Sequence, residues 1–191
     1  MRALLNSFLG MTLAGSLASF VIISCYYTFR YQNAKWNWLR IIALSLFTGY
    51  MTGLFSLTLE IAFVLENGMQ FNPADVNLVL FNEISRFLPY LFAPLGIINL
   101  WGNILIFVPV GFAVPLLTRG KHPLLRGLLW SALISVFIEC FQLFTPRTTD
   151  VDDVILNTLG GLIGAFLFVV FGKIFPRLAG RFKPPVVRRS A

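Results

Sequence analysis

Amide, carboxylate and guanidinium side chains recur at short intervals in the second half of an otherwise apolar sequence. Side chains of these types can hold a headgroup, relay a proton, or hydrogen-bond helices to one another. The set consists of Asn103, Glu139, Gln142, Arg147, Asp150, Asp153 and Asn157. Because a polar side chain inside a membrane is costly, each member requires a partner or a purpose.

The spacing of these residues places them on helices and on one turn. Glu139 and Gln142 lie three residues apart, so on a helix they share a face. An acidic turn follows Arg147, and we expect Asp152 or Asp153 to cap the next helix. The remaining carboxylates would then be free to reach Arg147 or a ligand.

A second group of residues has helical spacing upstream of the acidic turn. Asn99 and Asn103 lie four residues apart and therefore share a helix face. Pro109 interrupts the backbone ladder, and Gly102 and Gly111 allow neighbouring helices to approach closely. These amides and the acidic turn are predicted to meet at a common layer.

Several kinds of chemistry lack their usual motifs. The sequence has no Gly-x-Ser-x-Gly elbow, no phosphate-binding glycine loop and no His-Glu-x-x-His motif. The single histidine, His122, has no cysteine or carboxylate near it in sequence. We therefore expect no cofactor and no metal, although paired carboxylates can bind a divalent cation. Cys25 and Cys140 are expected at opposite ends of the molecule, where they cannot form a disulfide.

The composition identifies the environment of these residues as a membrane. Of 191 residues, 57% are hydrophobic and only 12% are charged, and 20 are phenylalanine. Soluble domains average about 25% charged residues. Five apolar stretches approach the roughly 20 residues that a spanning helix requires. They cover 8–29, 41–65, 97–117, 127–146 and 154–172.

The sequence therefore predicts an all-α, polytopic membrane helix bundle with five transmembrane helices. The first stretch is interpreted as a helix because it is longer than the core of a signal peptide. Twelve of the 15 lysines and arginines fall in segments 30–40, 119–126 and 173–189. By the positive-inside rule, the N-terminus is outside and the C-terminus is inside. Attraction of the basic segments to anionic lipid explains the net positive charge of the chain, so no nucleic-acid partner is expected.

The long connection after the second span is expected to lie outside. Asn72 can cap a helix with Pro73 at its first position, and apolar residues follow helical spacing to Leu88. We predict a short amphipathic outer helix there; a loop partly buried between helices is the alternative. The chain forms one membrane domain with three segments. These are two N-terminal helices and the start of the outer loop (1–76), a three-helix region (77–172) and a basic cytoplasmic tail (173–191).

At these positions the sequence resembles the VanZ-like family of bacterial membrane proteins. Segment 77–81 is similar to the family's Asn-Leu-Ile-Pro-Phe signature, with Leu80 in place of proline. The other motifs are Asn103-x3-Phe107-x-Pro109-x-Gly111, Glu139-x2-Gln142 and Arg147-x2-Asp150-x2-Asp153-x3-Asn157-x2-Gly160. The resemblance implies a multi-pass protein of the bacterial cell membrane, active at its extracytoplasmic face. The most concrete activity it implies is resistance to teicoplanin, a lipoglycopeptide antibiotic.

Three functions remain open at this point. The first is binding of a lipoglycopeptide or a lipid-linked envelope precursor, with membrane lipid as a further partner. The second is an intramembrane enzyme acting on a polar or phosphorylated lipid, with Glu139 or Asp153 as general base and Arg147 steadying a phosphate. The third is an ion or solute pathway, since membrane carboxylates often mark proton routes. Taken singly, each polar residue can also have a purely structural role, in which its side chain hydrogen-bonds one helix to another. The oligomeric state and the ligand are not indicated.

Overall fold

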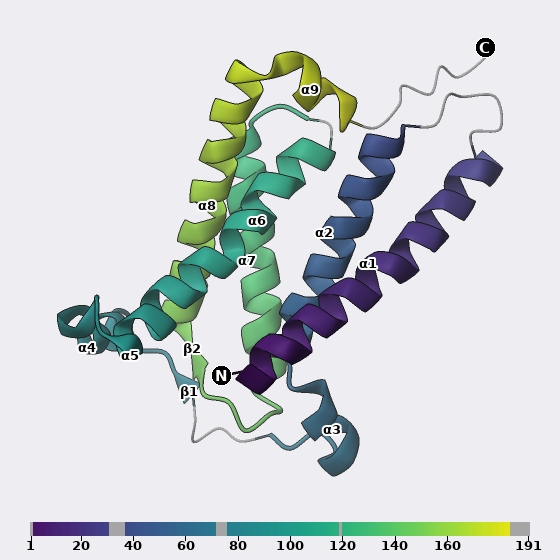
Figure 1. Ribbon diagram of the computed structural model, residues 1–191. Coiled ribbons are helices and arrows are strands. Elements are labelled where there is room, and N and C mark those ends of the chain that lie inside the picture. Colours follow the sequence, from purple (N-terminus) through teal and green to yellow (C-terminus); the bar gives the residue numbers. More distant parts are fainter. Residues whose placement is uncertain (1, 31–36, 72–75, 119, 184–191) are drawn as a thin grey trace.

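The computed structural model describes residues 2–30, 37–71, 76–118 and 120–183, and almost all of them are helical (Figure 1). Helices α1, α2 and α3 make up the first part of the chain. Their bounds are Arg2–Arg30, Trp38–Thr58 and Ile61–Asn67. The second part holds α4 (Asn82–Phe87), a 3-10 turn (Leu88–Tyr90), α5 (Pro94–Gly96), a π-helical turn (Ile97–Trp101), α6 (Gly102–Leu117), α7 (Pro123–Gln142), α8 (Val151–Ile174) and α9 (Pro176–Arg181).

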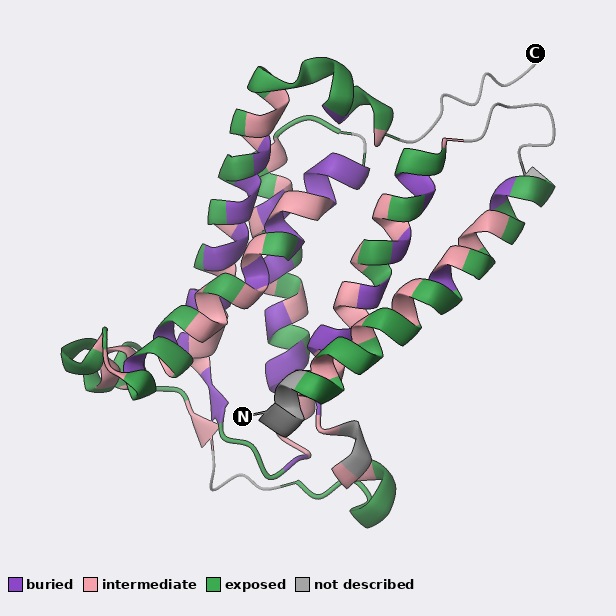
Figure 2. Ribbon diagram, in the orientation of Figure 1, coloured by how far each residue is buried: buried purple, intermediate pink, exposed green. Residues whose placement is uncertain are grey.

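Five helices within the described residues are long and apolar enough to cross a membrane, which confirms the predicted bundle. They cover Asn6–Phe29, Trp38–Thr58, Pro94–Leu117, Pro123–Gln142 and Val151–Ile174. Many large apolar side chains on them are exposed. In Figure 2 the buried residues gather where α6, α7 and α8 face one another, whereas much of α1 is exposed. Lipid is the natural solvent for such surfaces.

The second span differs from its predicted extent. The sequence predicts one apolar stretch over 41–65, but α2 ends at Thr58 and a new helix starts at Ile61. Glu60 lies between them with a φ of 45°, in the left-handed region that non-glycine residues rarely adopt. The chain therefore turns away from the bundle at Glu60, before the apolar stretch is finished.

Two pairs of helices approach closely because glycine lies at the contact. A Cβ at Gly49 of α2 would lie 1.9 Å from the Ser16 hydroxyl oxygen of α1. A Cβ at Gly111 of α6 would lie 1.8 Å from the Gly161 carbonyl oxygen of α8. Small residues allow such packing where lipid offers no hydrophobic driving force. Helices α6, α7 and α8 form a compact bundle, with the hairpin of α1 and α2 at its side (Figure 1).

The segment before the third span departs from the predicted amphipathic helix. Residues 72–75, which include the predicted cap and first turn, lie outside the described residues. Val76 and Asn77 form strand β1, which pairs in parallel with β2 (Thr149–Asp150). In the described part of the predicted range, only α4 and the 3-10 turn after it are helical. The apolar residues do have helical spacing, but Val76 and Asn77 form backbone hydrogen bonds with β2 instead of a helix.

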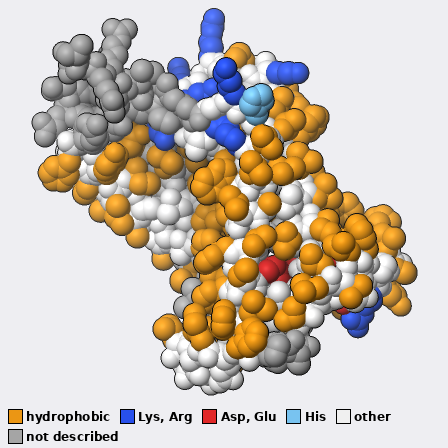
Figure 3. Space-filling view, turned by 180° about the vertical axis from the view of Figure 1, so that it is seen from behind, with side chains coloured by type: hydrophobic (Ala, Val, Ile, Leu, Met, Phe, Trp, Pro, Cys, Tyr) orange, Lys and Arg blue, Asp and Glu red, His pale blue; other side chains and the backbone are white. Residues whose placement is uncertain are grey.

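Charged residues divide between the two ends of the bundle. In Figure 3 most visible lysine and arginine side chains gather at one end, and acidic side chains lie toward the other end between hydrophobic side chains. The buried Arg40 ties the basic end together. Its guanidinium donates hydrogen bonds to the Tyr27 hydroxyl at 2.8 Å, to the Leu117 carbonyl at 2.9 Å and to the Phe182 carbonyl. The acidic end holds the polar residues singled out in the sequence.

Candidate functional site

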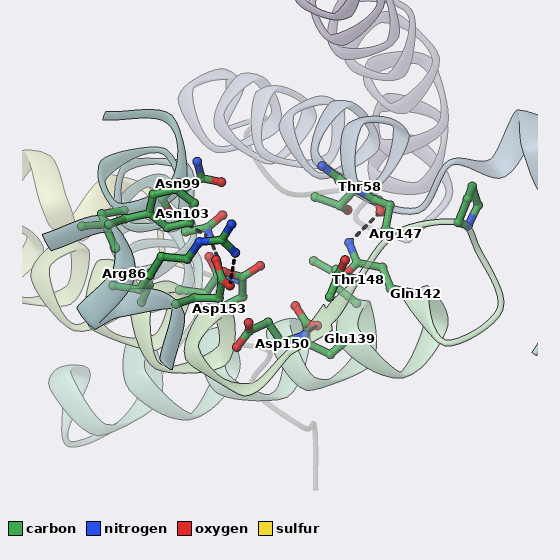
Figure 4. Close-up of a pocket in the computed structure, with 17 residues that line it drawn as sticks. Thr58, Arg86, Asn99, Asn103, Glu139, Gln142, Arg147, Thr148, Asp150 and Asp153 are labelled. Carbon is green, nitrogen blue, oxygen red and sulfur yellow. Dashed lines mark hydrogen bonds and ion pairs between the residues drawn. The ribbon is translucent and has the colours of Figure 1, made fainter. Parts of the chain in front are cut away.

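A cavity of about 520 Å³ opens where α6, α7 and α8 meet α4 and the end of α2. In Figure 4 the carboxylates of Glu139, Asp150 and Asp153 lie around one space, with side chains of Asn103 and Gln142 at its sides. Seventeen residues line it. They are Thr58, Glu83, Arg86, Phe87, Asn99, Leu100, Asn103, Ile138, Glu139, Gln142, Pro146, Arg147, Thr148, Asp150, Asp153, Leu156 and Asn157.

All seven predicted site residues line this cavity. The four motif residues that accompany them do not. Phe107 is buried in the core, Pro109 is exposed, and Gly111 and Gly160 lie at the contact between α6 and α8. The polar residues thus form the wall of the site, while three of the four motif residues pack the helices that carry it.

Glu139 holds the acidic turn against α7. Its Oε2 accepts a hydrogen bond from the Asp150 backbone N–H at 2.9 Å, and the Thr149 hydroxyl donates to the Glu139 carbonyl at 3.4 Å. The Asp150 side chain is tied to β1, because Asn77 Nδ2 donates to Asp150 Oδ2 at 2.8 Å. Asn77, which the predicted outer helix would leave facing water, is therefore half-buried and supports the site.

Asp150 caps α8, so the predicted capping by Asp152 or Asp153 is wrong. The Asp150 Oδ1 accepts a hydrogen bond from the Asp152 backbone N–H at 2.8 Å, two residues into the next helix. This arrangement is an ordinary N-cap, two or three positions earlier than expected. Burial of the side chain is the main cause that raises the pKa of Asp150, and the hydrogen bonds from Asp152 and Asn77 lower it in part.

Asp152 has a role that the sequence does not reveal. Its side chain is fully buried, and its two oxygens accept hydrogen bonds from the backbone N–H groups of Phe81 at 2.6 Å and Ile84 at 3.1 Å. Those N–H groups belong to the start of α4, where Phe81 offers no side-chain cap. Asp152 therefore caps α4 from a distant part of the chain. Through α4 it also positions Glu83 and Arg86 at the cavity.

Asn103 and Asp153 join α6 to α8 inside the cavity. The Asn103 Nδ2 donates hydrogen bonds to Asp153 Oδ1 and, at 3.1 Å, to the Asn99 carbonyl one turn earlier. The π-helical turn over Ile97–Trp101 precedes this point, and such turns often occur at functional sites. Asn99 also lines the cavity, as its shared helix face with Asn103 predicts.

Gln142 and Asn157 each use only one end of the side-chain amide. The Gln142 Nε2 donates to the Thr58 carbonyl at 3.0 Å, and the Asn157 Nδ2 donates to the Ser135 hydroxyl oxygen at 2.9 Å. Both side chains are buried, yet within the described residues neither amide oxygen has a hydrogen-bond partner. Buried polar atoms are nearly always satisfied in native proteins, so these two oxygens require an explanation.

Arg147 does not pair with the aspartates as the sequence suggests. Within the described part of the chain its ion pair is with Glu60, with 3.9 Å between Nε and Oε1, and it also donates to the Leu57 carbonyl at 3.3 Å. Glu60, with its left-handed backbone, thus pairs with an arginine that lines the cavity. Arg86 forms a second exposed ion pair, 3.1 Å from Glu83 in the same helix. Both arginines line the cavity.

The spanning helices and the polar cavity at one end define a polytopic α-helical membrane protein with a candidate binding site. A family model for VanZ/LLP1 matches residues 17–172. The chain therefore belongs to the VanZ/LLP1 family, which confirms the resemblance carried by the motifs. The match covers about half of α1 and all of α2, and so extends well beyond the 77–172 region. Comparison with curated proteins and with solved structures gave no significant match.

Proposed function

We propose that the cavity binds the polar part of a lipid-anchored molecule, either a lipoglycopeptide antibiotic or a lipid-linked envelope component. One observation carries the proposal. Four acidic residues and two arginines line a single cavity in a protein whose helices are otherwise strongly apolar. So many ionisable groups exceed what is needed to join three helices that already pack through glycine.

The surroundings of the cavity suit an amphiphile. Acidic side chains are visible between hydrophobic side chains in Figure 3, so a polar group inside the cavity can remain attached to a chain in lipid. The arginine side chains supply donors for a phosphate or carboxylate, because a guanidinium can bind either group with two hydrogen bonds. Arg147 is 43% exposed and its ion pair with Glu60 is long, so it is available to a ligand.

The cavity faces the extracytoplasmic side of a bacterial membrane in this proposal. The positive-inside rule supports that orientation, since Lys121, Arg126 and Lys173 lie at the opposite end of the bundle. Single cysteines introduced at Gln70 and at Lys121, in a variant lacking Cys25 and Cys140, test it. An impermeant thiol reagent added to intact cells should label position 70 and spare position 121. The reverse pattern would place the cavity in the cytoplasm.

The function is tested by teicoplanin susceptibility. A sensitive host expresses the natural protein, Glu139→Gln or Asp153→Asn at matched membrane levels, and Glu66→Gln serves as a control because Glu66 is exposed and lies outside the cavity. We expect protection by the natural protein and by Glu66→Gln, and loss of protection in both cavity variants. Equal protection by all four proteins would show that the cavity does not carry the activity.

A result in which even the natural protein fails to protect would remove the lipoglycopeptide as the ligand. The lipid-linked envelope component would then be the ligand under test. Lipid extracts from cells with and without the protein separate binding from catalysis. We expect no changed lipid species, and a new or missing species would favour an enzyme instead.

A further inference from the structure

Two buried side-chain oxygens without hydrogen-bond partners among the described residues indicate what kind of ligand group the cavity would bind. The orientation of the Gln142 amide is set by Thr58, because a backbone carbonyl can only accept a hydrogen bond and therefore selects the Nε2 end. Its Oε1 is left as an acceptor inside the cavity wall. The Asn157 Oδ1 is a second buried oxygen that has no hydrogen-bond partner in the described part of the chain. Gln142 is only 6% exposed and Asn157 only 5%, so bulk water is a poor partner for either oxygen.

The charged groups near these oxygens point to a cation. Glu139 and Asp153 lie on the same helices as Gln142 and Asn157, and each carboxylate has one oxygen engaged by a protein donor. The four acidic residues of the lining outnumber its two arginines. A positively charged group with several N–H donors would satisfy the amide oxygens and offset the excess of acidic residues at the same time.

The two arginines of the lining are exposed, unlike the two buried acceptors. Arg86 and Arg147 are the exposed members of the lining that carry positive charge, with side chains 70% and 43% exposed. Each is paired with a carboxylate that is also partly exposed, and such exposed pairs contribute little. A ligand phosphate can therefore bind these arginines at small cost, and it would leave the buried acceptors to another part of the ligand.

We propose that the cavity binds a zwitterionic amphiphile whose primary ammonium contacts Gln142, Asn157 and Glu139 and whose phosphate contacts Arg147 or Arg86. The inference rests on the proposed function and narrows it to one class of head group. A primary ammonium provides three donors, as a lysine does. A trimethylammonium group carries the same charge but no N–H, and it is usually bound by aromatic cages, whereas the lining has one aromatic residue, Phe87.

Lipid titration of the purified full-length protein tests the inference, with binding followed by native mass spectrometry. The probes are phosphatidylethanolamine and its mono-, di- and trimethylated counterparts with identical acyl chains. We expect affinity to fall at each methylation and at least tenfold in total, which corresponds to about 1.4 kcal/mol. The methylation series needs only the natural protein, so it remains decisive if a variant fails to fold.

Gln142→Leu removes one acceptor, and Gln70→Leu is the matched control because Gln70 is exposed outside the cavity. The preference for the primary ammonium should shrink at least threefold in Gln142→Leu and stay unchanged in Gln70→Leu. Water-soluble glycerophosphoethanolamine provides the last arm. We expect it to compete only at far higher concentration than the lipid, and competition at equal concentration would overturn the assignment to an amphiphile.

The outcomes separate this inference from the function on which it rests. Equal affinity across the methylated lipids, lost in Glu139→Gln, would overturn the ammonium assignment and leave lipid binding in place. Absence of binding to every lipid and to the lipidated antibiotic would overturn both. An equal preference for the primary ammonium in Gln142→Leu and in the natural protein would show that the Gln142 oxygen does not contribute to head-group selectivity.

Discussion

Replacement of Asp152 by alanine should release the start of α4 from the bundle. Asp152 accepts hydrogen bonds from the backbone N–H groups of Phe81 and Ile84, at 2.6 and 3.1 Å, and is fully buried. A hydrogen bond to a charged group contributes about 1.5–3 kcal/mol. Loss of both therefore costs roughly 3–6 kcal/mol, which exceeds what the short helix α4 can supply by itself. Asp152→Asn keeps one acceptor and should lose about half as much.

Hydrogen exchange resolved to single amides measures this effect directly. We expect exchange at Phe81 and Ile84 to accelerate by at least tenfold in Asp152→Ala, since 1.4 kcal/mol corresponds to a factor of ten. Amides in the middle of α7 should keep their protection, and Glu66→Ala should match the natural protein at all sites. Unchanged exchange at Phe81 and Ile84 would refute the capping of α4 by Asp152.

Three further effects follow from the packing, the basic end and the acidic turn. Gly111→Ala should lower the melting temperature in detergent, because its Cβ would lie 1.8 Å from the Gly161 carbonyl oxygen. The control Gly172→Ala should leave the melting temperature unchanged, because a Cβ there has nothing within 4 Å. Equal melting temperatures for the two variants would contradict the close contact of α6 with α8. Arg40→Ala should lower the free energy of unfolding by about 2 kcal/mol or more, because buried hydrogen bonds are lost. Arg177 is exposed, so Arg177→Ala should leave this free energy unchanged. Equal effects of the two substitutions in denaturant titrations would argue against the Arg40 contacts. Burial raises the pKa of Asp150 above 3.8, so the folded protein binds this proton more tightly than the unfolded chain, and the stability from it is full below about pH 4 and is lost as pH rises through the raised pKa. The free energy of unfolding of Asp150→Asn, measured from pH 4 to 8, should therefore decline less with pH than that of the natural protein, and a steeper decline would show the opposite shift.

The spanning helices and several residues that line the cavity were predictable because the membrane imposes simple rules. Apolar stretches with at most one charged residue predict the five spans, and the cost of polar groups in lipid singles out Glu139, Gln142 and Asn157. Helical spacing then places these side chains on common faces. Each of these inferences depends on local sequence or on the solvent. None of them requires knowledge of which segments of the chain come into contact.

The connections of the site were not predictable because they join segments far apart in the chain. The contacts of Asp152 with Phe81 and Ile84 span about 70 residues, as does the pairing of β1 with β2. The pair between Arg147 and Glu60 depends on a left-handed residue that interrupts an apolar stretch. Glu83 was therefore missed as a lining residue, and Asp152 was assigned to the wrong helix, α8 instead of α4.

Site-specific photocrosslinking tests most directly whether the cavity binds a lipid-anchored molecule. A photoreactive residue replaces Thr148, which is exposed and lines the cavity, or Gln70, which is exposed outside it. With a lipidated glycopeptide or precursor probe, we expect labelling from position 148 that is suppressed by unlabelled antibiotic or precursor, and little labelling from position 70. Equal labelling from both positions, unaffected by either competitor, would contradict a binding site in the cavity.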